Sequence, residues 1–196
     1  MAPTSSDIRS RAAAHTRDLQ RTLNSVLHWL VKATSPEPSP ILGRGPGYLF
    51  TAHENVMIAS WTAQGTGPLI AALAESLNAF AGQHPEGISN IHIIAAGLPL
   101  ANTEAREALA ALMKAHDGRL AAAGTVLDGT GFWASATRGV IMSLQMLAPS
   151  SFAMRTCATD AELVGWIVKP HAQRTGVTLD PQALERAMAQ ARALST

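Results

Sequence analysis

The chain has 196 residues, of which 47% are hydrophobic and 15% are charged, and its formal net charge is +1. With no basic excess and no long run of like charges, it lacks the electrostatic footprint of a nucleic-acid-binding protein. The single cysteine, Cys157, excludes an intrachain disulfide and a zinc site built from paired cysteines. No apolar stretch approaches the roughly 20 residues that cross a bilayer. We therefore expect a cytoplasmic protein with no membrane span and no nucleic-acid partner.

Apolar residues near the N-terminus recur at spacings of three and four, which is typical of an amphipathic helix. We assign this helix to residues 1–33. Its apolar stripe includes Leu19, Leu23, Val26 and Leu30. The stripe can pair with a second copy of the chain, with a partner protein or with the chain's own domain, and the sequence leaves all three open.

Residues 34–47 read TSPEPSPILGRGPG, with four prolines and three glycines. Proline cannot donate a backbone hydrogen bond, so this composition predicts an irregular linker. The folded domain is then expected to begin at Tyr48.

From residue 48 onward, segments rich in strand formers alternate with segments of helical periodicity. We predict strands at 48–52, 56–62, 88–96, 120–127 and 152–157, with a hairpin between the first two. We predict helices at 69–82, 103–116 and 132–147, the last with Phe132 on its apolar side. A further helix, capped by Thr159 and Glu162, is expected to end before Pro170.

Strands that alternate with helices require a largely parallel sheet with helices packed on it. The sequence therefore predicts an α/β fold, with a mixed, largely parallel sheet of about five strands in a domain spanning residues 48–169. Asp180 followed by Pro181 is typical of a helix start. We assign residues 170–196 to a C-terminal helical extension.

The order of elements, with a leading hairpin and a capped helix after the last strand, resembles the STAS domain, the fold of bacterial anti-sigma-factor antagonists. In that family an Asp-Ser-Ser-Gly motif begins a helix, and its first serine is a phosphorylation switch. Asn102 here takes the aspartate position and Thr103 the serine position, while Glu104 and Ala105 differ from Ser-Gly. The resemblance implies a non-enzymatic regulatory module of bacterial signalling. It implies a protein partner, either a kinase-type regulator or a second copy in a homodimer, bound through the helix that begins near Thr103.

Two turns are candidates for a functional surface. Asp128-Gly129-Thr130-Gly131 precedes a helix, where free backbone N–H groups can bind an anion, although a plain strand-to-helix turn is the simpler interpretation. The turn before Thr103 can likewise be a plain helix N-cap. In a parallel sheet both turns lie at the carboxyl edge, where ligands bind in open α/β folds. The predicted partner or ligand surface consists of Asn102, Thr103, Glu104, Arg106, Gly129, Thr130 and Gly131.

Signatures of catalytic serines, catalytic cysteines and zinc proteases are missing, and the seven histidines fall on different elements. We therefore predict no catalytic residue, no metal site and no cofactor. His92 is the most unusual histidine because it interrupts an apolar strand, and a satisfied core or sheet-edge side chain is its simpler interpretation.

Two other functions stay open. Phe132, Trp133, Met142 and Met146 lie around one predicted helix and, with the high hydrophobic content, indicate a binder of an apolar small molecule or lipid. Core packing is the simpler explanation of that cluster. An enzyme or nucleotide binder that uses the turn from Gly129 to Gly131 is the third hypothesis. An accessible cavity beside residues 97–104 and 128–133 would be the most informative structural observation.

Overall fold

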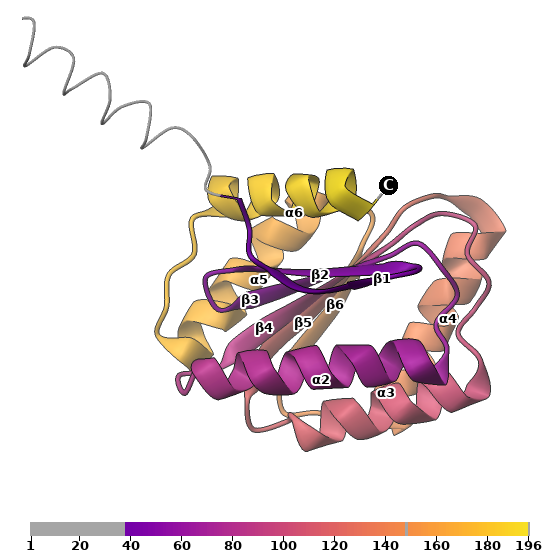
Figure 1. The fold of residues 1–196 in the computed structure, drawn as a ribbon, viewed down its shortest axis with the longest axis horizontal. Coiled ribbons are helices and arrows are strands. Elements are labelled where there is room, and N and C mark those ends of the chain that lie inside the picture. The colour runs from indigo at the N-terminus through magenta and orange to yellow at the C-terminus, as the bar shows by residue number, and fades with distance from the viewer. Residues whose placement is uncertain (1–37, 148, 196) are drawn as a thin grey trace, which may run out of the picture. The chain divides into compact units, whose positions relative to one another are not determined.

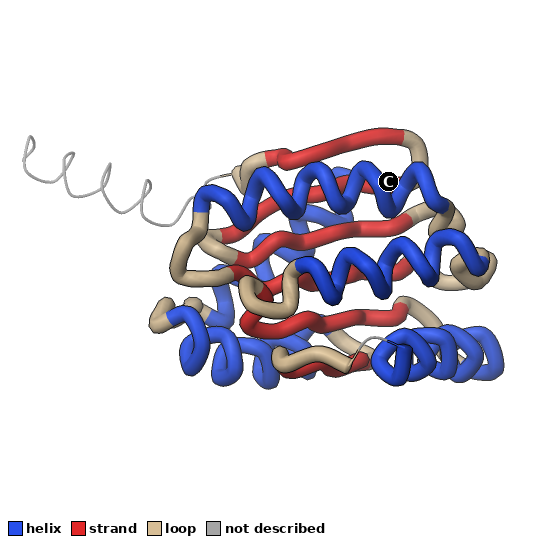
Figure 2. The backbone as a smooth tube through the Cα atoms, turned by 90° about the horizontal axis from the view of Figure 1, so that it is seen from below, coloured by secondary structure: helices blue, strands red, loops and turns tan. Residues whose placement is uncertain are grey.

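The computed structural model describes residues 38–147 and 149–195. Six strands lie side by side in one sheet, in the order in which they follow one another along the chain (Figure 2). They are β1 (Ile41–Gly45), β2 (Tyr48–His53), β3 (Val56–Trp61), β4 (Ile88–Ile94), β5 (Leu120–Leu127) and β6 (Ala153–Cys157). The pairs β1–β2 and β2–β3 are antiparallel, whereas β3 to β6 run parallel. The predicted α/β class with a mixed, mostly parallel sheet is confirmed.

Five helices of the described residues cover the sheet. They are α2 (Gly67–Gln83), α3 (Thr103–Ala115), α4 (Gly131–Leu147), α5 (Asp160–Thr175) and α6 (Pro181–Ser195). Each parallel strand is added on the same side of its predecessor, so right-handed crossovers put the connecting helices on one face. Accordingly α2 and α3 lie on one face, with α4 packed beside α3, and α5 and α6 lie on the other (Figure 1). None of these helices is long and apolar enough to cross a membrane.

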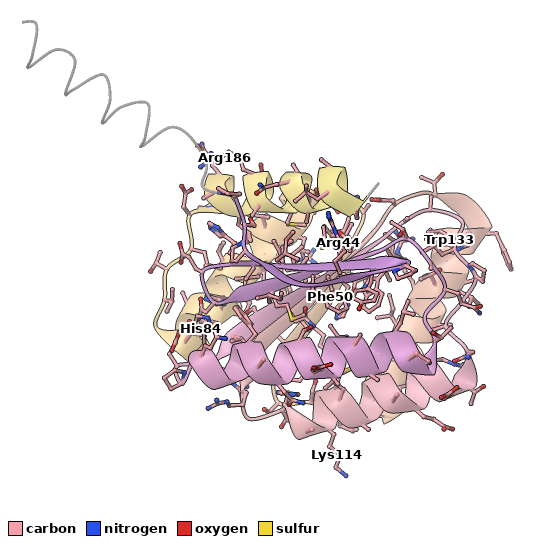
Figure 3. The ribbon with its side chains drawn as sticks, in the orientation of Figure 1. Arg44, Phe50, His84, Lys114, Trp133 and Arg186 are labelled. Atoms are coloured by element: carbon pink, nitrogen blue, oxygen red, sulfur yellow. The ribbon has the colours of Figure 1, made fainter. Side chains whose placement is uncertain are left out.

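The strands alternate between two apolar cores. Phe50, labelled in Figure 3, packs with Leu73 and Leu77 of α2 on one face. Ile91 packs with residues of α5 and α6, including Ile167, on the other. Successive residues of β4 therefore point in turn to the α2–α3 face and to the α5–α6 face.

The prediction of a linker over residues 34–47 is wrong from Ile41 onward, because Ile41–Gly45 forms the edge strand β1. The prolines lie outside this strand, and Pro46 occupies the turn to β2 together with Gly47, whose φ is 86°. A side chain at Gly47 would also meet Ala63. An edge strand tolerates the glycines and the register shift between Ile41 and Gly43, since one of its sides needs no partner.

The predicted end of a helix before Pro170 is also wrong, because α5 continues to Thr175. Proline removes one helical hydrogen bond, but Ile167 and His171 on either side of it are fully buried. Their burial keeps the helix continuous. Residues 170–196 are not a separate extension either, since α6 packs on β2 and β3 and buries Met188 in the core.

Predicted cap chemistry is confirmed at two helix starts. Thr159 Oγ1 accepts a hydrogen bond from the backbone N–H of Glu162 at 3.2 Å. Asp180 Oδ1 accepts one from the backbone N–H of Gln182 at 2.9 Å. The predicted N-terminal helix, with Leu19, Leu23, Val26 and Leu30, lies outside the described residues.

Candidate ligand-binding site

A cavity of about 150 Å³ lies between the sheet and helices α2, α3 and α4. The cavity is partly open, and an apolar cavity of this volume accepts a molecule of the size of benzene. Apolar side chains form its helical walls: Ile70 and Leu77 of α2, Leu109, Leu112 and Met113 of α3, and Trp133, Val140 and Ile141 of α4. Leu98, Pro99, Leu100 and Ala101 line it where the chain leaves β4.

Polar side chains occur mainly on the sheet side of the cavity. Asn90 and His92 are alternate residues of β4, so both point to the face that α2 and α3 cover. Thr125 is the register partner of His92 on β5 and also lines the cavity. Among the described residues, no Asp, Glu, Lys or Arg lines it.

Trp61 fixes the imidazole of His92. Trp61 Nε1 donates a hydrogen bond to His92 Nδ1 at 3.1 Å, and the two rings stack with centroids 6.0 Å apart and an interplanar angle of 14°. Burial lowers the pKa of His92 to about 4, because a charged imidazole would lose its hydration there. His92 is therefore neutral at pH 7.

Asn90 is 4% exposed, and its side-chain amide lies 3.1 Å from His92 Nε2. The other atom of the amide, Oδ1, has no hydrogen-bond partner. A buried polar group without a partner costs stability, so such a group at a cavity wall indicates a place where a ligand atom can bind.

Two side-chain hydrogen bonds, one from Trp133 and one from Gln64, hold the loop after β4 in place. Trp133 Nε1, on the first turn of α4, donates to the carbonyl oxygen of Leu98 at 2.6 Å. Gln64 Nε2 donates to the carbonyl oxygen of Leu100 at 2.8 Å. Trp133 lies at one end of the sheet and His84, which caps α2, lies at the other (Figure 3). The hydrogen bond of Trp133 thus holds α4 and the loop together at the carboxyl edge of the parallel strands.

The predicted surface residues lie around this edge. Asn102 is the N-cap of α3, with Oδ1 accepting a hydrogen bond from Ala105 N at 2.8 Å. Thr103 Oγ1 accepts one from Arg106 Nη2 at 3.1 Å. Asn102, Thr103 and Glu104 are exposed.

The glycine-rich turn meets the loop after β4. Gly129, Thr130 and Gly131 are exposed, and a side chain at Gly129 would lie 3.1 Å from Ala96 Cβ. The glycine-rich turn and the start of α4 therefore contact the loop after β4 at Ala96 and Leu98, and the cavity lies beside the stretches 97–104 and 128–133 through Leu98 and Trp133.

The apolar cluster predicted on α4 divides into two parts. Trp133 lines the cavity, whereas Phe132, Met142 and Met146 are 89%, 64% and 83% exposed. The prediction that Phe132 faces inward is wrong, because the buried side of the helix is one position further along, at Trp133, Ala134 and Thr137. The exposed side chains of Phe132, Met142 and Met146 therefore belong neither to the core nor to the cavity.

Sequence reasoning identified His92 as unusual but did not identify Trp61, Asn90 or Thr125 as members of a site. One signal was present: two polar residues at alternate positions of an apolar strand share a face, so Asn90 and His92 belong together. Trp61 and Thr125 become neighbours of His92 only because their strands, β3 and β5, pair with β4.

Other chemistry finds little support in the part of the chain that the structure describes. It contains no group of three or more His, Cys, Asp or Glu side chains that could hold a metal ion. Burial raises the pKa of the Cys157 thiol, which is the opposite of what a nucleophilic cysteine needs.

Comparison of the chain with protein-family models, with curated proteins and with solved structures gave no match. The structure shows an α/β fold with a cavity that runs between one face of the sheet and α2, α3 and α4 and reaches the loop at the carboxyl edge. The resemblance to the STAS domain rests on the order of elements and stays a prediction.

Proposed function

We propose that this chain is a non-enzymatic binding module that holds a small apolar molecule in the cavity between the sheet and α2, α3 and α4. The observation that carries the proposal is the lining of the cavity, which is mostly apolar on its helical walls, apart from Thr137, and polar on the sheet side at Asn90, His92 and Thr125. Most ligand sites combine apolar walls with a few placed polar groups in this way.

The energetic cost of the cavity supports a function for it. A partly open apolar cavity of about 150 Å³ leaves its lining side chains without packing partners, which lowers stability relative to a filled core. The unpartnered amide atom of Asn90 adds roughly 1 to 3 kcal/mol. Such costs are typical of binding sites, where stability is given up for function.

Native mass spectrometry of the freshly purified full chain tests the proposal. We expect an adduct of small mass that is lost on denaturation. A cavity-filling variant, Ala123→Leu, should lose the adduct and keep or gain stability, because Ala123 lines the cavity. Ala122→Leu is the matched control on the opposite face, where Ala122 is fully buried, and overpacking there should cost about 1 to 3 kcal/mol.

Two results together would contradict the proposal. One is the lack of any adduct and of any thermal shift with a panel of small aromatic and aliphatic molecules. The other is a loss of stability in Ala123→Leu as large as that in Ala122→Leu, which would mean that the space is already filled.

Binding of a protein partner is the second candidate, as the STAS resemblance implies. The exposure of Asn102, Thr103 and Glu104 at the start of α3 and of Phe132 on the first turn of α4 favours it. A phosphate on Thr103 would lie at the positive end of α3. Chemical crosslinking of the wild type, Thr103→Glu and Arg106→Ala tests this surface, and equal yields of crosslinked partner or homodimer in all three would contradict it.

A further inference from the structure

The described residues that line the cavity offer no group that could neutralise a charged ligand. None of them is Asp, Glu, Lys or Arg, and the one titratable side chain among them, His92, is neutral at pH 7. Transferring an ion into such a site without a counter-charge is strongly unfavourable. The lining therefore favours an uncharged molecule.

The tautomer of His92 decides which atom of Asn90 remains without a partner. Because Trp61 can only donate, His92 Nδ1 must accept and the hydrogen of the neutral ring must lie on Nε2. If Asn90 Nδ2 faced Nε2, two donors would oppose each other. A half-turn of the amide, which hardly changes its shape, presents Oδ1 to Nε2–H and satisfies the pair.

The half-turn puts Asn90 Nδ2 in the position that has no hydrogen-bond partner. An amide nitrogen has two hydrogens to donate and no lone pair to accept with. The unmet need of this cavity-lining residue is therefore for an acceptor. A buried donor left without one costs more than an ordinary hydrogen bond contributes, so the site discriminates between ligands with and without an acceptor.

We propose that the cavity selects an uncharged, mainly apolar molecule, of the size of a substituted benzene, that carries a carbonyl-type acceptor bonded to Asn90 Nδ2. This assignment rests on the proposed function, since it names the ligand class of the same cavity. A hydrocarbon of equal shape fits the walls but leaves the amide unpaired.

Acetophenone and α-methylstyrene are suitable probes because they differ only in C=O against C=CH₂. Isothermal titration of the full chain gives a dissociation constant for each. The ratio of the two constants measures the preference for acetophenone over α-methylstyrene. We expect this preference to be about tenfold greater in the wild type than in Asn90→Leu. Thr125→Val, which removes a hydroxyl from the same wall and keeps the amide, should retain the wild-type ratio.

The outcomes separate the two proposals. Binding of neither probe to the wild type contradicts the proposed function and this inference with it. Binding of both, with the same ratio in the wild type and Asn90→Leu, contradicts the ligand class alone. A loss of preference in Thr125→Val but not in Asn90→Leu would mean that the amide is the wrong donor.

A measurement on the wild type covers the case in which Asn90→Leu does not fold. The infrared C=O stretch of bound acetophenone should lie at lower frequency than that of acetophenone in hexane, because the oxygen accepts a hydrogen bond. A stretch at the hexane frequency would contradict the inference.

Discussion

Two histidines, the partly buried His92 and the fully buried His171, lie on opposite faces of the sheet and are kept neutral by their surroundings. His92 accepts from Trp61 on the cavity face. On the other face, His171 Nδ1 lies 2.8 Å from Ser89 Oγ. Burial lowers the pKa of each to about 4. A charged imidazole at either position would be held out of water, so neither side chain takes up a proton near pH 6.

The stability of the protein should therefore fall in mild acid. Burial lowers the pKa of both histidines from the ordinary 6.5 to about 4 in the fold, so the unfolded chain binds more protons between these values. The free energy of unfolding should decrease as the pH falls from about 6.5 to about 4, by up to roughly 3 kcal/mol for each histidine, and these groups should have no effect above about pH 7.5. Urea denaturation over this range measures the slope.

The variants His92→Gln and His171→Gln should each show a shallower slope than the wild type, because each removes one titrating group. Equal slopes in all three proteins would mean that neither histidine is the source of the pH dependence.

At the scale of the element, α4 covers the cavity with a helix of low intrinsic stability. The hydroxyls of Ser135, Thr137 and Ser143 donate back to carbonyl oxygens of their own helix, at 3.2, 3.0 and 2.7 Å. Hydroxyl residues that bond in this way, and glycine at Gly139, weaken helices. This suits a helix that moves when a ligand enters or leaves the cavity.

Gly139→Ala tests that interpretation. Gly139 is exposed, and a Cβ there would meet no atom within 4 Å. Alanine should raise the free energy of unfolding by about 0.5 to 1 kcal/mol and slow the release of a bound probe. Gly165→Ala in α5 is the matched control, since Gly165 is equally exposed and unobstructed. It should give the same stability gain without changing the release rate, and equal release rates in both variants would contradict a gating role for α4.

Arg192 of α6 connects three segments. Its Nε and Nη2 donate to the carboxylate of Asp160 at 3.0 and 2.7 Å, and its Nη1 pairs with Asp128. Burial opposes the charge of Arg192, but the hydrogen bonds of both aspartates outweigh it and raise the pKa of the guanidinium. The glycine-rich turn is thereby fixed to α6 and to the start of α5.

Arg192→Lys should lower the free energy of unfolding by about 1 to 2 kcal/mol, because lysine cannot form the paired contact with Asp160 and reach Asp128 together. Arg186→Lys, an exposed position on the same helix (Figure 3), should change it by less than about 0.5 kcal/mol. Urea denaturation measures both. Equal effects would mean that the cluster of Arg192, Asp128 and Asp160 adds nothing to stability.

For the molecule as a whole, the sequence predicted what depends on local pattern. Apolar alternation and helical spacing located β5 and the start of α3 at Thr103, and the alternation of elements predicted the parallel sheet. Local signals failed where tertiary contacts prevailed: β1 forms between prolines because β2 offers it an edge, and α5 passes Pro170 because its flanks are buried.

The cavity could not be predicted in this way. The cavity is the space that side chains from four strands and three helices leave unfilled. Sequence periodicity assigns each of these side chains to a face of the sheet, but it does not give the volume that they leave between them. The carboxyl edge of the sheet, which the cavity reaches at Leu98 and Trp133, did follow from the topology, since parallel strands present their carboxyl ends together.

The most direct test of a ligand-binding cavity is an NMR titration of the tryptophan indole N–H signals with α-methylstyrene. Trp61 and Trp133 line the cavity, whereas Trp166 packs against the core on the opposite face. We predict saturable shifts of the Trp61 and Trp133 signals and an unmoved Trp166 signal. If the signals of Trp61 and Trp133 stay in place at saturating probe, or if Trp166 moves as much as they do, the cavity is not a binding site.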